Sequence, residues 1–175
     1  MLIIHSVRKL LNTSRVEAAL YITEPNQSQY LHGWYARLLP SGFAGKMMVM
    51  YVHEPSLMCI VCKGKTIQGT WDNFLERLEA LLKRFNFPNA FIKNELLQAE
   101  GYVISKTNSR SMLSFMNQMV FDLEYNCMKS EDFAAIPLDW MEEQMMDRPY
   151  QQGKKQYEFR TPLQYWQQAI GLVAR

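Results

Sequence analysis

The sequence has few of the features that mark a secreted or membrane protein. Cysteine occurs three times in 175 residues, and an odd number in a chain of this length argues against a disulfide framework. No apolar run approaches the roughly 18 to 20 residues that cross a bilayer. Residues 1–9 do not form a secretory signal, because the basic pair follows the short apolar run instead of preceding it. The cytoplasm is therefore the expected compartment.

The sequence also lacks an excess of charge of one sign, and it lacks low-complexity tracts. Lys and Arg number 19 against 17 Asp and Glu, a net charge of +2, which is too near neutral to predict nucleic-acid binding from global charge. There is no long Pro, Gly or Ser tract and no run of like charges. With 48% apolar and 13% aromatic residues, the composition predicts one domain over residues 1–175.

The common catalytic motifs are absent from the sequence. There is no P-loop, dinucleotide fingerprint, nucleophile elbow or zincin motif. No cofactor is predicted. A site assembled from residues distant in sequence stays compatible with these absences.

The strongest strand signal is a pair of apolar runs at residues 46–53 and 57–62, separated by Glu54-Pro55-Ser56. Pro55 presets a turn and cannot donate to a strand ladder, so the pattern predicts a hairpin. Both faces of both strands are apolar, which predicts the hairpin at the centre of the sheet. Three other segments are strand candidates: residues 2–7, 102–106 and, more weakly, 18–23. Residues 30–39 are ambiguous, because their apolar residues have helical spacing.

Five helices are predicted in the rest of the chain. Thr70 is a candidate N-cap for the first, and Ser109 caps a long helix with a stripe of methionines on one face. Thr161-Pro162-Leu163-Gln164 is a capping box. The expected bounds are 70–85, 89–100, 109–125, 137–147 and a helix from 161. We therefore predict an α+β fold, a small mainly antiparallel sheet with a central hairpin covered by four to six helices, with 149–158 a flexible connection to the C-terminal helix.

Cysteines and histidines give weak indications of chemistry. Cys59 and Cys62 form a C-x-x-C pair, but within a strand they point to opposite faces and are expected to be buried hydrophobic residues. His5, His32 and His53 lack the spacing of a metal site. A structural role for each histidine is favoured over that of a ligand or general base.

Four carboxylates cluster on the helix predicted at residues 137–147: Asp139, Glu142, Glu143 and Asp147. Glu143 and Asp147 are i, i+4 neighbours and could chelate a divalent ion. A solvated helix face is the more common arrangement. The alternative functional hypothesis, a small metal-dependent hydrolase or nuclease, would use Asp139, Glu142 or Glu143 together with a histidine.

Basic residues flank several of the predicted elements. They are Arg8, Lys9, Lys46, Lys63, Lys65, Lys106 and Arg110. Beside Trp34, Tyr35 and Trp71 they could form a patch for single-stranded nucleic acid. Ordinary solubilising charge at element ends is the favoured interpretation, and the sequence does not say whether they form one patch.

Three segments taken together resemble a known family. They are Ile3-Ile4 followed by Lys9-Leu10-Leu11, then His32-Gly33-Trp34-Tyr35-Ala36-Arg37-Leu38-Leu39, then Asn108-Ser109-Arg110-Ser111-Met112-Leu113 followed by Met116-Asn117. The order resembles an uncharacterised bacterial family known only as a domain of unknown function. The resemblance covers roughly residues 1–125 and leaves the later helices as an extension. It implies no activity and no catalytic residue.

Arg110 is the most informative residue of these motifs. A cation in the first turn of a helix is unfavourable, because the helix dipole there prefers anions, so Arg110 predicts a specific acceptor: a carboxylate, a carbonyl or a bound phosphate. A structural acceptor within the protein is the favoured interpretation. We predict a binding or regulatory module that recognises a protein or nucleic acid near His32, Trp34, Arg110 and Asn117. A homodimer and a structural subunit of a larger assembly are both compatible with the sequence.

Overall fold

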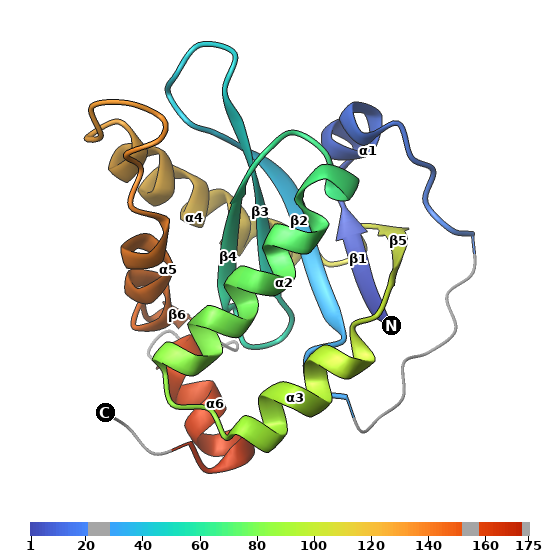
Figure 1. The fold of residues 1–175 in the computed structure, drawn as a ribbon, viewed down its shortest axis with the longest axis vertical. Coiled ribbons are helices and arrows are strands. Elements are labelled where there is room, and N and C mark those ends of the chain that lie inside the picture. Colours follow the sequence, from blue (N-terminus) through green and yellow to red (C-terminus); the bar gives the residue numbers. More distant parts are fainter. Residues whose placement is uncertain (21–28, 152–157, 173–175) are drawn as a thin grey trace.

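A five-stranded sheet forms the centre of the computed structural model, which describes residues 1–20, 29–151 and 158–172 (Figure 1). Its strands are β1 (Leu2–Ser6), β2 (Gly33–Pro40), β3 (Met47–His53), β4 (Cys59–Lys63) and β5 (Tyr102–Lys106). Their order is β4-β3-β2-β1-β5. β1 is parallel to β2 and β5, whereas β3 is antiparallel to β2 and β4. The α+β class is confirmed, and the sheet is mixed instead of mainly antiparallel.

The central strand is β2, which resolves the ambiguity over residues 30–39. Trp34 faces one hydrophobic core and Tyr35 faces the other. Because both faces of β2 are covered, apolar residues occur at almost every position, and helical spacing appears among them by chance.

The predicted hairpin exists as β3 and β4, with both faces buried, but it lies at one side of the sheet. β4 is an edge strand. Its Val61 N–H, which has no strand partner on that side, donates to the buried carboxylate of Glu142 at 2.9 Å. Burial on both faces therefore did not identify the central strand.

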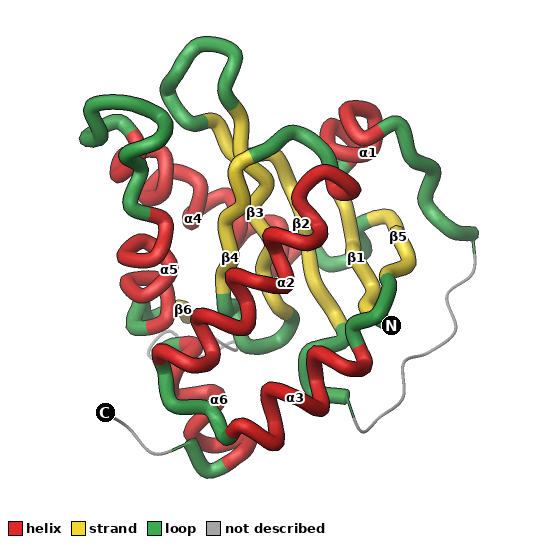
Figure 2. Tube along the Cα trace, viewed as in Figure 1, coloured by secondary structure: helices red, strands yellow, loops and turns green. Residues whose placement is uncertain are grey.

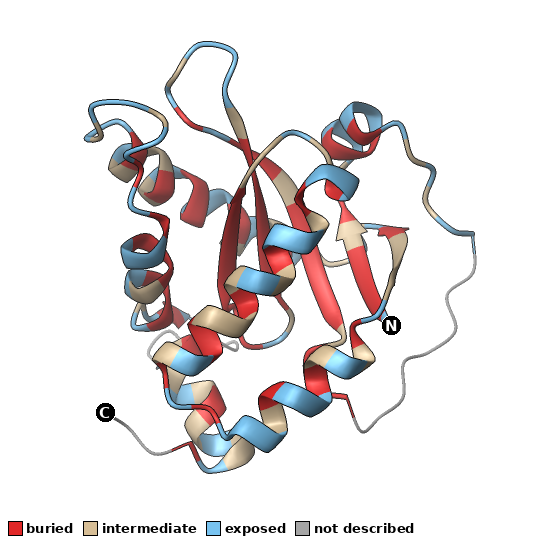
Figure 3. Ribbon diagram, viewed as in Figure 1, coloured by how far each residue is buried: buried red, intermediate tan, exposed pale blue. Residues whose placement is uncertain are grey.

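Among the described residues, six helices cover the sheet in two layers, as Figures 1 and 2 show. Their bounds are α1 (Arg8–Ser14), α2 (Ile67–Arg84), α3 (Asn89–Gln98), α4 (Arg110–Cys127), α5 (Leu138–Met146) and α6 (Pro162–Ile170). α1, α2, α3 and α6 pack over one face, and α4 with most of α5 packs over the other. Each layer presents its buried residues to the sheet (Figure 3).

Two of the predicted helix caps are observed and one differs. Ser109 Oγ accepts the N–H of Met112 at 3.3 Å, and Thr161 with Gln164 forms the capping box. α2 begins earlier than predicted, because Thr66 is its N-cap, accepting from the N–H of Gly69. Thr70 is inside the helix, where its hydroxyl contacts Tyr51 Oη at 2.7 Å and bonds back to the carbonyl of Thr66.

The segments at the sheet margins and near the C-terminus are irregular. Residues 18–20 of the predicted 18–23 strand are not a strand, although Ala19 N–H donates to the Ile104 carbonyl of β5 at 2.8 Å. Residues 21–23 lie outside the described residues. Within the predicted 149–158 connection, β6 (Tyr150–Gln151) pairs with β7 (Phe159–Arg160), and 152–157 lie outside the described part. No helix in the described residues has the length and apolarity needed to cross a membrane.

Candidate functional site

The outer face of α4 carries an unusual set of exposed side chains. Its buried stripe contains Met112, Met116 and Met119, as the sequence predicted. On the opposite side Phe121 is 74% exposed, Tyr125 63% and the neighbouring Met128, at the helix C-cap, 72%. Since positions three or four apart share a helix face, these three residues form one apolar stripe that faces solvent.

Polar and cationic groups lie on the same face. Arg110 and Asn117 are exposed and fall in line with Phe121 at intervals of seven and four residues. At the far end, Lys129 Nζ lies 4.1 Å from the Tyr125 ring centroid, a cation–π contact. We call Arg110, Asn117, Phe121, Tyr125 and Met128 the α4 outer face. Two of its five members were predicted as site residues from the sequence.

A groove of about 510 Å³ runs beside this face, between α4, α1 and the end of β2. Lys9, Arg37 and Asn117 contribute its polar lining together with Glu124. Arg37 Nη1 donates to Asn117 Oδ1 at 2.5 Å, while its Nε–H has no acceptor among the described residues. Burial lowers the pKa of Arg37 and the nearby Glu124 opposes that shift, so the groove holds a half-buried cation with a free donor.

His32 and Trp34 do not join Arg110 and Asn117. Trp34 is fully buried on the face covered by α2, where it meets the Phe74 ring edge-on at 4.9 Å. Its indole N–H donates to the Leu31 carbonyl at 2.8 Å. His32 precedes the start of β2, and Arg110 follows the end of β5. Because both strands are parallel to β1, the two residues lie at opposite ends of the sheet.

His53 is the most deeply buried histidine, and its contacts are structural. Its Nε2 bonds to the Tyr30 carbonyl at 2.9 Å and its Nδ1 to Ser56 Oγ at 2.7 Å. A carbonyl can only accept, so Nε2 carries the proton. Burial lowers the pKa of His53 to about 3, which keeps the ring neutral between the side chains of Trp34 and Trp166.

The carboxylates of α5 are held by arginines of α2. Arg77 donates to both oxygens of Glu142, at 2.9 and 2.8 Å, and to Asp139 at 2.8 Å. Arg84 contacts Glu142 at 3.3 Å and Glu143 at 2.8 Å. Burial raises the pKa of Glu142, and hydrogen bonds from Arg77 and from the Val61 N–H counteract that rise.

This arrangement differs from both interpretations of the acidic helix, a solvated face and a metal site. Glu142 is buried, so the helix face is not uniformly solvated, and its oxygens are engaged by cations. Within the described residues, no three His, Cys, Asp or Glu side chains are placed to hold a metal ion. These carboxylates bind α5 to α2.

The cysteines lie where the strand geometry predicts. Cys59 belongs to the core beneath α4 and Cys62 to the core beneath α2, so they point to opposite faces. Both are free and buried, and burial raises the pKa of each thiol. Thiolate chemistry is therefore disfavoured at this pair.

The predicted basic residues at the ends of β1, β4 and β5 and at the start of β3 lie toward one end of the sheet, in different local settings. Lys46 and Lys63 lie over the Phe133 ring, at 5.9 and 5.2 Å from its centroid. Arg8 and Lys106 line a second cavity at the ends of β1 and β5, and Lys9 lines the groove beside α4. Of the aromatic residues expected beside them, Trp34 and Tyr35 are buried.

The fold and the α4 outer face define a mixed-sheet α+β domain with a solvent-facing aromatic helix. Residues 3–164 match the family model described as "Domain of unknown function (DUF6933)", and the chain belongs to that family. The match extends beyond the 1–125 predicted from the motifs, so α5 and the first turn of α6 are parts of the domain and not an extension. No curated protein matches the chain.

Sequence reasoning missed the exposed aromatic residues of α4. Their signal was present, because Phe121, Tyr125 and Met128 follow the i, i+4, i+7 spacing out of phase with the methionine stripe. A helix with apolar residues on two faces has one face more than its own core requires. That second face is the candidate site.

Proposed function

We propose that this protein is a binding module for single-stranded nucleic acid, and that it binds through the α4 outer face and the adjoining groove. The observation that carries the proposal is the alignment of solvent-facing Phe121 and Tyr125 with Arg110 and Asn117 on one helix face. Proteins that bind single strands without reading sequence combine aromatic rings, on which bases stack, with cations that follow the phosphates.

The cations nearby favour a nucleic acid over an apolar protein surface. Arg110 makes no salt bridge within the described residues, and neither does Lys9 or Arg37 in the groove. Along the helix axis Arg110 and Phe121 are about 16 Å apart, from a rise of about 1.5 Å per residue. A strand of a few nucleotides can place phosphates on one group and bases on the other across that span.

Arg110 fits this role for a physical reason. At the start of a helix its charge opposes the dipole, so the position costs stability unless an anion offsets it. A phosphate bound there would meet both the guanidinium and the positive end of the helix. The proposal also keeps the cytoplasmic location that the three free cysteines favour.

The test is fluorescence anisotropy with labelled single-stranded DNA and RNA oligonucleotides of mixed sequence. We expect binding that weakens by roughly tenfold between 50 and 200 mM salt, the loss that neutralising about two to three phosphates of a single strand produces. Stacking contributes about 1–3 kcal/mol per base. The Phe121→Ala, Tyr125→Ala double variant should therefore bind at least about tenfold more weakly.

The matched control is Leu97→Ala, which removes an exposed apolar side chain from α3. It should bind as tightly as the wild type. Absence of binding to either oligonucleotide at about 20 μM protein and low salt, where even non-specific binders associate, would overturn the proposal. Equal losses in the α4 variant and in Leu97→Ala would also overturn it.

A further inference from the structure

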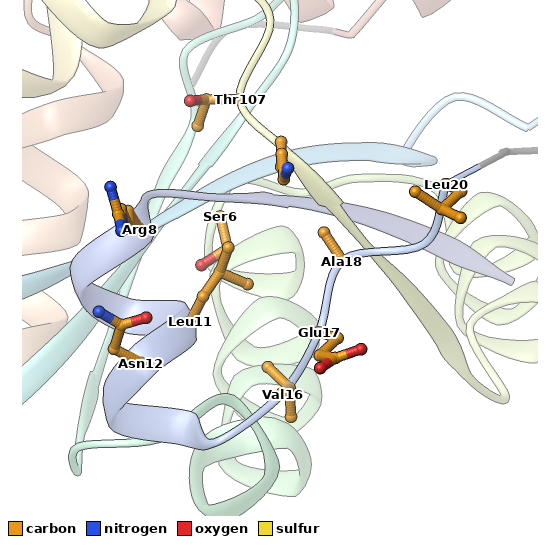
Figure 4. Close-up of a pocket in the computed structure, with 10 residues that line it drawn as sticks. Ser6, Arg8, Leu11, Asn12, Val16, Glu17, Ala18, Leu20 and Thr107 are labelled. Atoms are coloured by element: carbon orange, nitrogen blue, oxygen red, sulfur yellow. The ribbon is translucent and has the colours of Figure 1, made fainter.

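A second cavity lies at the carboxyl ends of β1 and β5, apart from the α4 outer face (Figure 4). Its volume is about 740 Å³, within the range of pockets that enclose small organic ligands. Ser6 of β1 lies at the centre of the view, α1 lies on one side, and residues 16–20 lie on the other (Figure 4). Ligands of sheets with parallel strands commonly bind at this end.

Two cations from different elements line the cavity. Arg8 comes from the start of α1 and Lys106 from the end of β5. Both are exposed, and neither makes a salt bridge with any residue in 1–20, 29–151 or 158–172. Arg77 and Arg84, in contrast, share the Glu142 carboxylate. The cavity thus presents two positive charges that no carboxylate of the described residues pairs with.

The remaining lining is partly polar and partly apolar. Asn12 and Glu17 offer an amide and a carboxylate, and Thr107 offers a hydroxyl. Leu11 and Val16 supply apolar surface between them. A bare inorganic anion would leave the apolar wall and the carboxylate unused, and a purely apolar ligand would leave both cations unused.

From this lining we infer that the cavity binds a small organic phosphate of about the size of a nucleoside monophosphate. A phosphate monoester carries a charge of about −1.5 to −2 near neutral pH, which two cations match better than one. Arg8 and Lys106 hold the phosphate. Leu11 and Val16 pack on the organic body, and Glu17 with Asn12 accepts hydrogen bonds from its hydroxyl or amino groups. This site does not depend on nucleic-acid binding by α4.

The test is isothermal titration calorimetry with four probes: nucleoside monophosphates, ribose 5-phosphate, an unphosphorylated nucleoside and inorganic phosphate. We expect one of the two organic phosphates to bind at least tenfold more tightly than the nucleoside or inorganic phosphate. The Arg8→Ala, Lys106→Ala double variant should lose at least tenfold in affinity. Lys93→Ala, which removes an exposed cation from α3, is the matched control and should leave the affinity unchanged.

Both substituted cations are exposed, so the variant should keep the wild-type circular dichroism spectrum and melting temperature. The inference is overturned if no organic phosphate binds with a Kd of about 1 mM or lower, which corresponds to a binding free energy of about −4 kcal/mol. It is also overturned if inorganic phosphate binds equally well, or if the double variant binds like the wild type. The Phe121→Ala, Tyr125→Ala variant should bind the organic phosphate as tightly as the wild type. Failure of this inference can therefore be distinguished from failure of the nucleic-acid proposal.

Discussion

The two longest helices, α2 and α4, each have 18 residues and cover opposite faces of one sheet, yet their outer surfaces differ. The outside of α2 is polar, and its Glu79 and Lys83 form an i, i+4 ion pair. The outside of α4 shows Phe121, Tyr125 and Met128 to solvent. The buried stripes of both helices cover the sheet in the same way, so the fold requires no aromatic residues on the solvent-facing side of α4. Their exposure is therefore better explained by binding than by packing.

The cations of the two helices differ in the same way. Arg77 and Arg84 of α2 are fixed by carboxylates of α5, and they join the two layers. Arg110 of α4 is exposed and makes no salt bridge in the described chain. Paired charges thus serve the fold, and we propose that the cations left unpaired in the described residues bind the ligand. Three predictions test this division, beginning with the largest change in stability.

The strongest test removes the carboxylate that holds the α2 arginines. Glu142→Ala should lower the free energy of unfolding by about 3–5 kcal/mol, the usual result of removing one partner of a buried ion pair. It leaves the Val61 N–H without its acceptor and leaves Arg77 with Asp139 as its remaining partner. Urea denaturation of Glu142→Ala and of Glu143→Ala, a partly exposed neighbour, measures the difference. A loss below about 1 kcal/mol, the range of exposed pairs, would contradict a structural role for this carboxylate.

A smaller effect should appear as a pH dependence on the α2 side of the sheet. The pKa of His53 is about 3 in the folded protein, against 6.5 for the free side chain. As the pH falls, the unfolded chain therefore protonates at His53 before the folded protein does. Stability from this residue is complete above pH 6.5 and is lost as the pH falls toward 3. Between pH 7 and pH 5 the loss should be about 2 kcal/mol.

His53→Gln is the comparison for that measurement, since glutamine keeps a donor for the Tyr30 carbonyl but does not titrate. Urea unfolding at both pH values should show the variant losing less stability than the wild type. Parallel losses in the two proteins would mean that His53 is solvated and titrates normally.

The smallest change in stability is expected on the outside of α4. Phe121→Lys and Tyr125→Lys should each change the free energy of unfolding by no more than about 0.5 kcal/mol, as for other exposed positions away from the core. Thermal denaturation followed by circular dichroism measures this, with Phe74→Ala in the buried stripe of α2 as the destabilised reference. A loss above about 2 kcal/mol from either lysine would show that these rings belong to the core.

Local patterns predicted most of the elements because local physics sets them. The hairpin, the methionine stripe of α4 and the capping box at Thr161 each follow from a few neighbouring residues. The position of the hairpin did not, because β4 is completed by Glu142, which lies about eighty residues later. The residues next to Glu142 in the sequence give no sign that its side chain is buried, because α5 carries both polar and apolar residues.

The candidate site shows the same division. Arg110 was recognised because it conflicts with its own helix dipole, and Asn117 because it follows on that helix. His32 and Trp34 were joined to them only by the order of motifs. Their distance from Arg110 depends on the parallel pairing of β1 with β2 and β5, which the sequence did not reveal.

The Glu142 carboxylate also bears on how copies of this protein could meet. An unprotected outer strand invites a neighbouring molecule to add its own strand. Here the N–H of Val61 is already occupied by Glu142, and on the opposite side Ile104 accepts from Ala19 of the same chain. A neighbour would have to displace these bonds to extend the sheet at either place.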